Sequence, residues 1–345
     1  MSDPSSDSIF SPDFIPPGSQ LEKQGIIIPR GPQGSWDDGM VECPMVWWDP
    51  RQNAYGLVHT GYKQIHPERQ SYEAVGKPQI GLAWSKDLFH WEKDERSPIF
   101  GPEPQAASYD RSGCSGPLIW LQDEVYYLFY FGTTEEGYEG GRKALNVAQS
   151  SDLIHWERFA GNPIIEPAGE GWRREAIWHP HIQKVAGTYY LFFNASGQVN
   201  GLDEEFIGYA TSQDLLHWEV QDTDCPLLVG SRIPGHWDSS GRTGDPSLYR
   251  VGDTWYMAYY SWDQVHTQDG LAATTREAFP RGWKPFVNNP ILAKGRNGAF
   301  DALHAGKPFV YRTEHQHLHF YTAVDDQGVR EIALATGNFQ PLAAS

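Results

Sequence analysis

The sequence predicts an all-β protein built from five repeated units, and three observations lead to this prediction. The phrase "SKDLFHW" at 85–91 returns as "SSDLIHW" at 150–156 and as "SQDLLHW" at 212–218. A seven-residue phrase that recurs every 62 to 65 residues indicates a repeat architecture. The 35 glycines, 25 prolines and 14% aromatic residues are typical of short strands joined by turns.

Each unit is expected to start with a strand that carries an X-X-Pro sequence and to continue with an aromatic-rich strand. We call this first strand the inner strand, and its prolines are Pro44, Pro117, Pro180, Pro246 and Pro308. The third strand reads "IGLAWS", "LNVAQS", "IGYATS", "GLAATT" and "EIALAT" in the five units. A short fourth strand is expected after the repeated phrase, at "SPIF", "NPII", "CPLL" and "NPIL". The fifth unit lacks this strand.

The missing strand is expected near the other terminus. "GIIIPRG" at 25–31 resembles "NPILAKG" at 289–295, so the N-terminal strand should complete the last sheet. Four-stranded units closed into a ring by such an exchange form a five-bladed β-propeller. The alternative, a linear β-solenoid, would not need this transfer. We therefore expect a disordered tail at 1–20 and a single propeller catalytic domain at 21–345.

Composition excludes several classes of partner. A formal charge of −17 argues against nucleic acid and anionic membrane surfaces, which are bound by basic faces. The first residues show no export signal, and no apolar stretch is long enough for a membrane anchor. The three cysteines, Cys43, Cys114 and Cys225, do not suggest a disulfide framework, so we expect a cytoplasmic protein. The sequence does not indicate an oligomeric state.

Comparison of the units separates structural positions from candidate functional ones. Asp87 and His90 recur in the repeated phrase of the next two units, so we interpret them as turn residues, with the following tryptophan packed between blades. The units also share a second equivalent position, which we call a column, seven or eight residues before each proline. It is occupied by Asp37, Asp110, Arg173, Asp238 and Asp301. Its aspartates are interpreted as structural, and Arg173 is the exception. The "HQHLH" stretch at 315–319 is expected at the surface, and His181 in the core.

The start of each inner strand should face the ligand pocket, and there the units differ. Blades one, three and four contribute Glu42, His179 and Asp245, which we take as the catalytic candidates. These residue types suit cleavage of a glycosidic bond. In that reaction one protonated acid must assist the leaving oxygen, and one ionised group must activate water or attack the anomeric carbon. Arg242 could keep Asp245 ionised, and Glu42, which is flanked by Val41, Cys43 and Pro44, is the better candidate for the protonated acid, although the sequence does not settle which group is acid and which is base. The substrate-binding candidates are Arg173, Glu175, Trp178, Arg242, His304 and Lys307.

At these strands the sequence resembles the five-bladed propeller glycosidases of families 43 and 32, over about residues 25 to 340. Those families carry two aspartates and a glutamate in blades one, three and four, where this sequence has Glu42, His179 and Asp245. "VECP" at 41–44 looks like the family 32 acid motif, although it lies in blade one. The related family 117 uses a histidine as acid, which implies that His179 and His304 are also candidate proton donors.

We therefore expect an exo-acting glycoside hydrolase that cleaves a small oligosaccharide and needs no cofactor. Cations such as Arg174 and Lys307 suit either an anionic sugar or inorganic phosphate as the nucleophile, the second as in the family 130 phosphorylases that the sequence resembles. A sugar-binding propeller without activity is the non-enzymatic alternative. No metal site is expected, because His304 alone does not make one, although a structural ion or water beside it in the channel fits the prediction.

Overall fold

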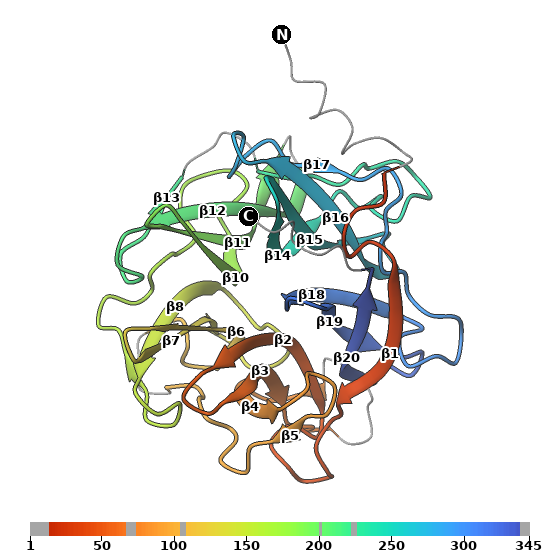
Figure 1. The fold of residues 1–345 in the computed structure, drawn as a ribbon. Helices are drawn as coiled ribbons and strands as arrows, with labels where there is room; N and C mark the ends of the chain where they lie inside the picture. The colour runs from red at the N-terminus through yellow and green to blue at the C-terminus, as the bar shows by residue number, and fades with distance from the viewer. Residues whose placement is uncertain (1–13, 67–73, 104–107, 200–201, 222–225, 339–345) are drawn as a thin grey trace.

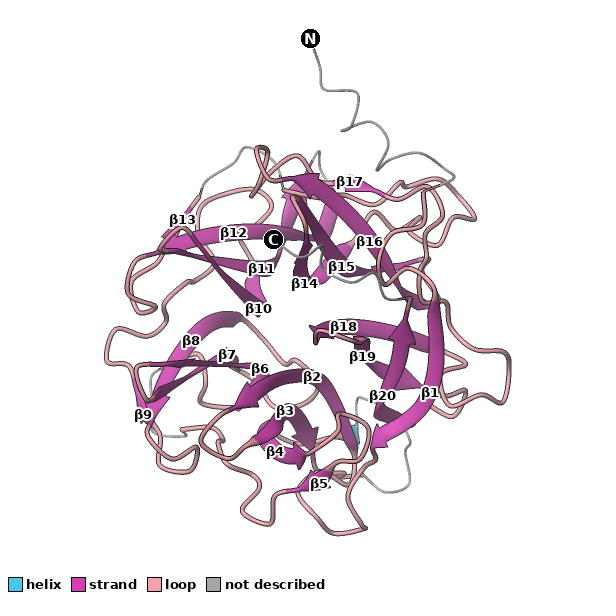
Figure 2. Cartoon of the chain, viewed as in Figure 1, coloured by secondary structure: helices cyan, strands magenta, loops and turns pink. Residues whose placement is uncertain are grey.

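The computed structural model describes residues 14–66, 74–103, 108–199, 202–221 and 226–338. Five four-stranded antiparallel sheets surround a central axis, and strands and loops make up nearly all of the described residues (Figures 1 and 2). This arrangement confirms the five-bladed propeller. Among the described residues, no helix has the length and apolar character needed to cross a membrane.

Each blade pairs its strands in sequence order from the axis outward. The first blade contains β2 (Met40–Asp49), β3 (Ala54–Tyr62), β4 (Gln79–Ser85) and β5 (Glu92–Lys93). The second contains β6 (Gly113–Gln122), β7 (Val125–Thr133), β8 (Lys143–Ser150) and β9 (Glu157–Arg158), and the third β10 (Ala176–Val185), β11 (Thr188–Val199), β12 (Leu202–Ser212) and β13 (Glu219–Val220). The fourth contains β14 (Thr243–Val251), β15 (Thr254–Trp262), β16 (Thr267–Thr275) and β17 (Lys284–Pro285).

The last blade combines both ends of the polypeptide. It contains β18 (His304–Arg312), β19 (His317–Val324) and β20 (Arg330–Gly337), and its outer strand is β1 (Leu21–Ile28), which pairs antiparallel with β20. Figure 1 shows the red β1 beside the blue β20. The predicted strand exchange is confirmed. Of the predicted tail, residues 1–13 lie outside the described residues, while Gly18 N–H donates to the carbonyl of Asn338 at 3.0 Å.

The fourth strands differ from the prediction in position. They are the two-residue strands β5, β9, β13 and β17, close behind the repeated tryptophan or its equivalent rather than at the X-Pro-Ile segments. The predicted segments instead form single bridges to the third strand, such as Ile80 with Phe100 and Leu145 with Ile165. The proline in each segment lacks an N–H, which limits longer pairing there.

The repeated phrase forms the same turn in each of the three blades. In the first, Asp87 Oδ1 accepts the N–H groups of Phe89 and His90 at 2.9 and 2.8 Å, and Oδ2 contacts His90 Nδ1 at 2.7 Å. Trp91 then packs edge-on against Phe320 of the last blade, with ring centroids 6.1 Å apart. The structural interpretation of the phrase is confirmed.

The second column is confirmed as well. Its buried aspartates pair with a cation on the outer strand of the same blade: Asp37 with Lys93, Asp110 with Arg158 and Asp301 with Lys23, at 2.5 to 2.7 Å. In the third blade both members of the pair differ: Arg173 stands at the aspartate position, and Val220 stands at the position of the cation on the outer strand. Asp238 instead accepts a hydrogen bond from Ser231 Oγ.

Two predictions for histidines have opposite outcomes. His181 is in the core, where its Nε2 accepts the N–H of Leu248 from the next blade at 3.1 Å. The 315–319 stretch is not at the surface as a whole, because His317 and His319 are buried. His319 Nε2 lies 2.9 Å from the buried carboxylate of Asp269 and thereby joins the last blade to the fourth. Every residue of β19 is buried, because the strand lies between β18 and β20 inside its blade, and the polar composition of the stretch obscured this position.

Each inner strand contains a bulge at its proline, and this bulge positions the site. The pairing register shifts there in all five blades. The residue before each proline takes a left-handed conformation: Cys43, Gly116, His179, Asp245 and Lys307, with φ of 49° to 59°. All five surround the channel at the axis. This conformation costs energy for residues other than glycine, and side chains of the preceding blade support it. Asn194 Oδ1, for example, accepts the N–H of Asp245 at 2.6 Å.

Candidate active site

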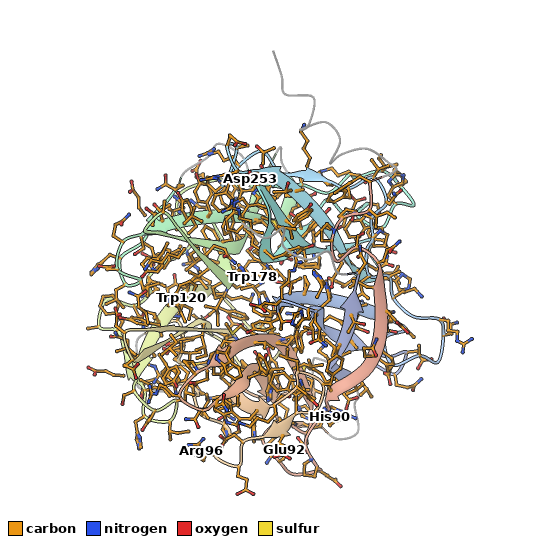
Figure 3. All side chains as sticks on the ribbon, in the orientation of Figure 1. His90, Glu92, Arg96, Trp120, Trp178 and Asp253 are labelled. Carbon is orange, nitrogen blue, oxygen red and sulfur yellow. The ribbon has the colours of Figure 1, made fainter. Side chains whose placement is uncertain are left out.

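A cavity of about 220 Å³ lies above this ring of left-handed residues. Its ionisable lining groups are Glu139, His179, Glu205, Asp245, His304, Lys307 and Arg330. Trp178 also lines the cavity and lies near the axis in Figure 3, whereas His90 of the repeated turn lies at the periphery. Below the ring the channel narrows to a space of about 40 Å³ lined by the five inner-strand prolines. The cavity and this narrower space share His179, Asp245 and Lys307 in their linings.

Glu205 and Asp245 form the central carboxylate pair. Asn194 Nδ2 donates to Glu205 Oε1 at 3.0 Å and to Asp245 Oδ1 at 2.7 Å. Those two oxygens consequently lie at most about 5.7 Å apart, the limit reached if both bonds lay on one line. A separation of roughly 5 to 5.5 Å between carboxyl groups is typical of retaining glycosidases, and inverting enzymes have wider pairs.

The environment of Glu205 keeps its carboxyl protonated at neutral pH. Its side chain opens onto the cavity, and protein encloses its other sides. Burial and the negative charge of Asp245 raise its pKa to about 8, although the hydroxyl of Tyr260 donates a hydrogen bond that favours the ionised form. A neutral carboxyl beside an ionised one is the arrangement that separates an acid from a nucleophile.

A third carboxylate reaches the cavity from the loop between β7 and β8. Glu139 Oε1 lies 2.7 Å from Lys307 Nζ and 3.5 Å from His179 Nε2. Burial opposes ionisation of Glu139, but Lys307 and His179 outweigh it and hold its pKa well below the ordinary value. The loop thus extends from blade two to residues of blades three and five.

His179 links these charged groups. Its Nε2 lies 3.1 Å from Lys307 Nζ and 3.4 Å from Asp245 Oδ1, and its ring packs edge-on against Phe131. Burial disfavours the charged form of Lys307, yet neighbouring acidic groups, including Glu139 and Glu42, raise its pKa well above the ordinary value. Lys307 is therefore a fixed cation at the cavity floor.

Glu42, expected at the pocket, has a different position. Its carboxylate is fully buried and is not among the lining groups of the cavity. It accepts hydrogen bonds from Arg330 Nη1 at 2.9 Å and from the hydroxyl of Tyr62 at 3.3 Å, and it lies 3.6 Å from Lys307 Nζ. The physical reason is its register: in the first blade Cys43, not Glu42, is the left-handed residue that faces the axis.

The remaining predicted residues divide into two groups. His179, Asp245, Trp178, His304 and Lys307 line the cavity, whereas Arg173, Glu175 and Arg242 do not. The guanidinium of Arg242 lies over the ring of Trp262 at 4.9 Å, near enough for its charge to affect Glu205. Glu175 forms an ion pair with Arg174 at 3.1 Å, and about half of its side chain is exposed (49%).

Sequence reasoning missed Tyr138, Glu139, Glu205 and Arg330. Two of these residues belong to a further column, which occupies equivalent pairing positions near the start of each third strand. That column reads Pro78, Lys143, Glu205, Thr267 and Arg330. The residue type at this position differs in every blade, and this difference is the signal that would have identified Glu205 and Arg330 as candidates. Tyr138 and Glu139 lie in the loop between β7 and β8, and the corresponding loops of the other units differ from it in length, so the repeat gave no information about these two residues.

Solved structures resemble this protein along almost its whole length. A protein described as a glycoside hydrolase gives a TM-score of 0.74 at 16% identity, and the match covers 100% of this protein and 98% of that one. A thermostable family 43 glycoside hydrolase gives a TM-score of 0.64 at 16% identity, over 92% and 98% of the two proteins. A structure from the GH130 family of mannoside phosphorylases, which contains glycoside hydrolases, gives 0.67 at 15% identity, over 97% and 98%. The fold is that of the five-bladed propeller glycoside hydrolases.

Comparison of the sequence with known proteins gives matches that cover less of this protein than the structural matches do. No family model matches the sequence. An uncharacterized protein of Mycobacterium tuberculosis, Rv1502, is 28% identical over 166 residues, which cover 47% of this protein and 50% of the relative. An extracellular endo-α-(1→5)-L-arabinanase of Thermotoga petrophila is 29% identical over 173 residues, or 42% of this protein and 33% of the arabinanase. The matched region thus spans half or less of the length of these relatives.

The propeller shows no clustered metal ligands in its described part. Within those residues, no three histidine, cysteine, aspartate or glutamate side chains are grouped so as to hold an ion. His304, which we considered beside a channel water or ion, accepts the N–H of Thr267 on its Nδ1 at 3.0 Å.

Proposed function

We propose that this protein hydrolyses glycosidic bonds, with Glu205 as general acid and Asp245 as nucleophile. The observation that carries the proposal is the pair itself, two carboxyl groups held by one amide group at the wall of a cavity, with burial and the charge of Asp245 raising the pKa of Glu205. The propeller fold of named glycoside hydrolases supports the same reaction class.

The proposed reaction has two steps. Glu205 transfers its proton to the glycosidic oxygen as the bond from the anomeric carbon to that oxygen breaks, while an oxygen of Asp245 forms a bond to the anomeric carbon. Glu205, now ionised, then removes a proton from water, whose oxygen displaces Asp245 and releases the sugar. The two inversions give net retention, which is compatible with the limit of about 5.7 Å between the two oxygens that Asn194 holds.

Three further residues of the cavity, Glu139, Lys307 and His179, would assist the reaction of Glu205 and Asp245. Glu139 is ionised and close to the reacting centre, so it would stabilise the positive charge that develops on the sugar ring. Lys307 fixes Glu139 at 2.7 Å. His179, within 3.4 Å of Asp245 Oδ1, would orient the nucleophile.

The shape of the cavity favours removal of one terminal sugar. At about 220 Å³ it is smaller than the 300 to 1,000 Å³ typical of pockets for drug-sized ligands, and the proline-lined space beside it measures only about 40 Å³. We therefore propose exo-action on a small oligosaccharide. The cytoplasmic location expected from the sequence stays a prediction and would restrict the substrate to imported sugars.

A panel of aryl glycosides, assayed with and without inorganic phosphate, tests the proposal. Hydrolysis without phosphate that is lost in Glu205→Gln is expected. Turnover only with phosphate would favour the phosphorylase, and sugar binding without turnover would favour a non-catalytic propeller. For the phosphorylase, Lys307 Nζ already contacts Glu139, His179 and Glu42, so phosphate would have to bind other donors of the cavity.

A further inference from the structure

The wall of the cavity formed by the last blade carries hydrogen-bond donors that the proposed reaction does not use. His304 on β18 pairs with Val324 on β19, and Val324 pairs with Arg330 on β20. All three line the cavity. Adjacent strands are about 4.8 Å apart, so the backbones of His304 and Arg330 are separated by about 10 Å, with Val324 between them.

Arg330 uses only one of its three nitrogens within the protein. Nη1 donates to Glu42 at 2.9 Å and to the hydroxyl of Tyr138 at 3.2 Å. Among the described residues, Nη2 and Nε have no hydrogen-bond partner, and the side chain is 12% exposed at the cavity. Glu42 thus compensates for burying the guanidinium and leaves its outer edge available.

His304 adds a second donor whose orientation is fixed. Because Nδ1 accepts the N–H of Thr267, the proton of the neutral ring is on Nε2. Burial and then the charge of Arg330 lower the pKa of His304 to about 4, which keeps the ring neutral and indicates that the two side chains are close. No described residue accepts a hydrogen bond from Nε2.

We propose that the terminal sugar of the substrate is a uronic acid, whose carboxylate binds the outer edge of Arg330 and Nε2–H of His304. The inference rests on the proposed function. A planar carboxylate accepts two parallel hydrogen bonds from a guanidinium and offers a remaining lone pair to a third donor. Glu139, Glu205 and Asp245 contribute acceptors or an acid rather than donors, so the anomeric end of the sugar faces them and the carboxylate faces the last blade.

Titration calorimetry with free sugars tests this inference independently of hydrolysis. The probes are D-glucuronate and D-galacturonate, each compared with its neutral counterpart, D-glucose or D-galactose. We expect the uronates to bind at least about tenfold more tightly, which corresponds to about 1.4 kcal/mol. Arg330→Lys keeps a cation for Glu42 but removes the planar fork, and it should abolish the preference. Arg242→Met removes a guanidinium that does not line the cavity and should retain it.

The outcomes separate this inference from the proposed function. Equal affinity for neutral sugars and uronates, or a preference unchanged in Arg330→Lys, would overturn it even if neutral aryl glycosides are hydrolysed. Selective binding of uronates that Arg330→Lys abolishes would support it even if no aryl glycoside is cleaved, in which case only the proposed hydrolysis fails. His304→Phe provides a second variant with the Glu42–Arg330 pair intact, and the preference should fall there too.

Discussion

Glu205 and Asp245 accept hydrogen bonds from the same nitrogen atom, Asn194 Nδ2, at 3.0 and 2.7 Å. Asn194 also accepts the N–H of Asp245, at 2.6 Å, and so supports the left-handed backbone at that residue. One amide group therefore determines both the separation of the two carboxyl groups and the conformation of one of them. This shared contact keeps Asp245 near Glu205, and the negative charge of Asp245, together with burial, raises the pKa of Glu205.

Removal of the acid is expected to reduce turnover strongly. Glu205→Gln keeps the size of the side chain but cannot give a proton to the leaving oxygen, so kcat should fall by about 10²- to 10⁴-fold on substrates with poor leaving groups. Glu204→Gln is the matched control, since Glu204 pairs with Arg232 and does not line the cavity. Equal kcat values for the two variants in steady-state assays would exclude Glu205 as the acid.

The pH dependence of activity should report the same group. Because burial and Asp245 raise the pKa of Glu205 to about 8, kcat/KM should fall above this pH, by about tenfold per pH unit. An aryl glycoside whose leaving group needs no protonation should show a weaker decrease. A profile that is flat to pH 9 with an unactivated substrate would contradict the assignment.

Stability should depend on pH through Glu205 in a direction that can be calculated. Its pKa is higher in the folded protein than in the unfolded state, so folding retains a proton that the unfolded state releases. The stabilisation is complete below the ordinary value of 4.5 and is lost as the pH rises to about 8. Urea unfolding of wild type and Glu205→Gln across this range should show the variant gaining relative stability, by up to about 1.4 kcal/mol per pH unit.

The repeat made the fold predictable, because each unit repeats the same four-strand pattern and "GIIIPRG" supplies the strand missing from the last one. The site was only partly predictable. His179, Asp245 and Lys307 stand directly before their prolines, where the bulge turns each side chain to the axis. Glu42 stands one position earlier and is buried among Tyr62, Arg330 and Lys307. A bulge changes which residue faces inward, and strand patterns alone do not show it.

The stereochemistry of hydrolysis should identify the partner of Glu205. With Asp245 as nucleophile, the first sugar released should keep the anomeric configuration of the substrate, because two successive inversions give retention. Proton NMR during the first minutes, before mutarotation, distinguishes the two anomers. Inversion would mean that water attacks the anomeric carbon directly, and it would exclude Asp245 as the nucleophile.

Glu42→Gln distinguishes a structural from a catalytic role for the residue that the sequence favoured. Its carboxylate compensates two buried cations, with Arg330 at 2.9 Å and Lys307 at 3.6 Å. Removing one partner of a buried ion pair usually costs about 3 to 5 kcal/mol, because the other charge stays buried without compensation. The variant should therefore unfold at clearly lower urea, and the pKa near 8 in the kcat/KM profile of its folded fraction should persist. A fully stable Glu42→Gln protein whose kcat falls by 10²-fold or more, and whose kcat/KM profile has lost the pKa near 8, would restore Glu42 as the acid, because removal of the proton donor removes its ionisation from the profile.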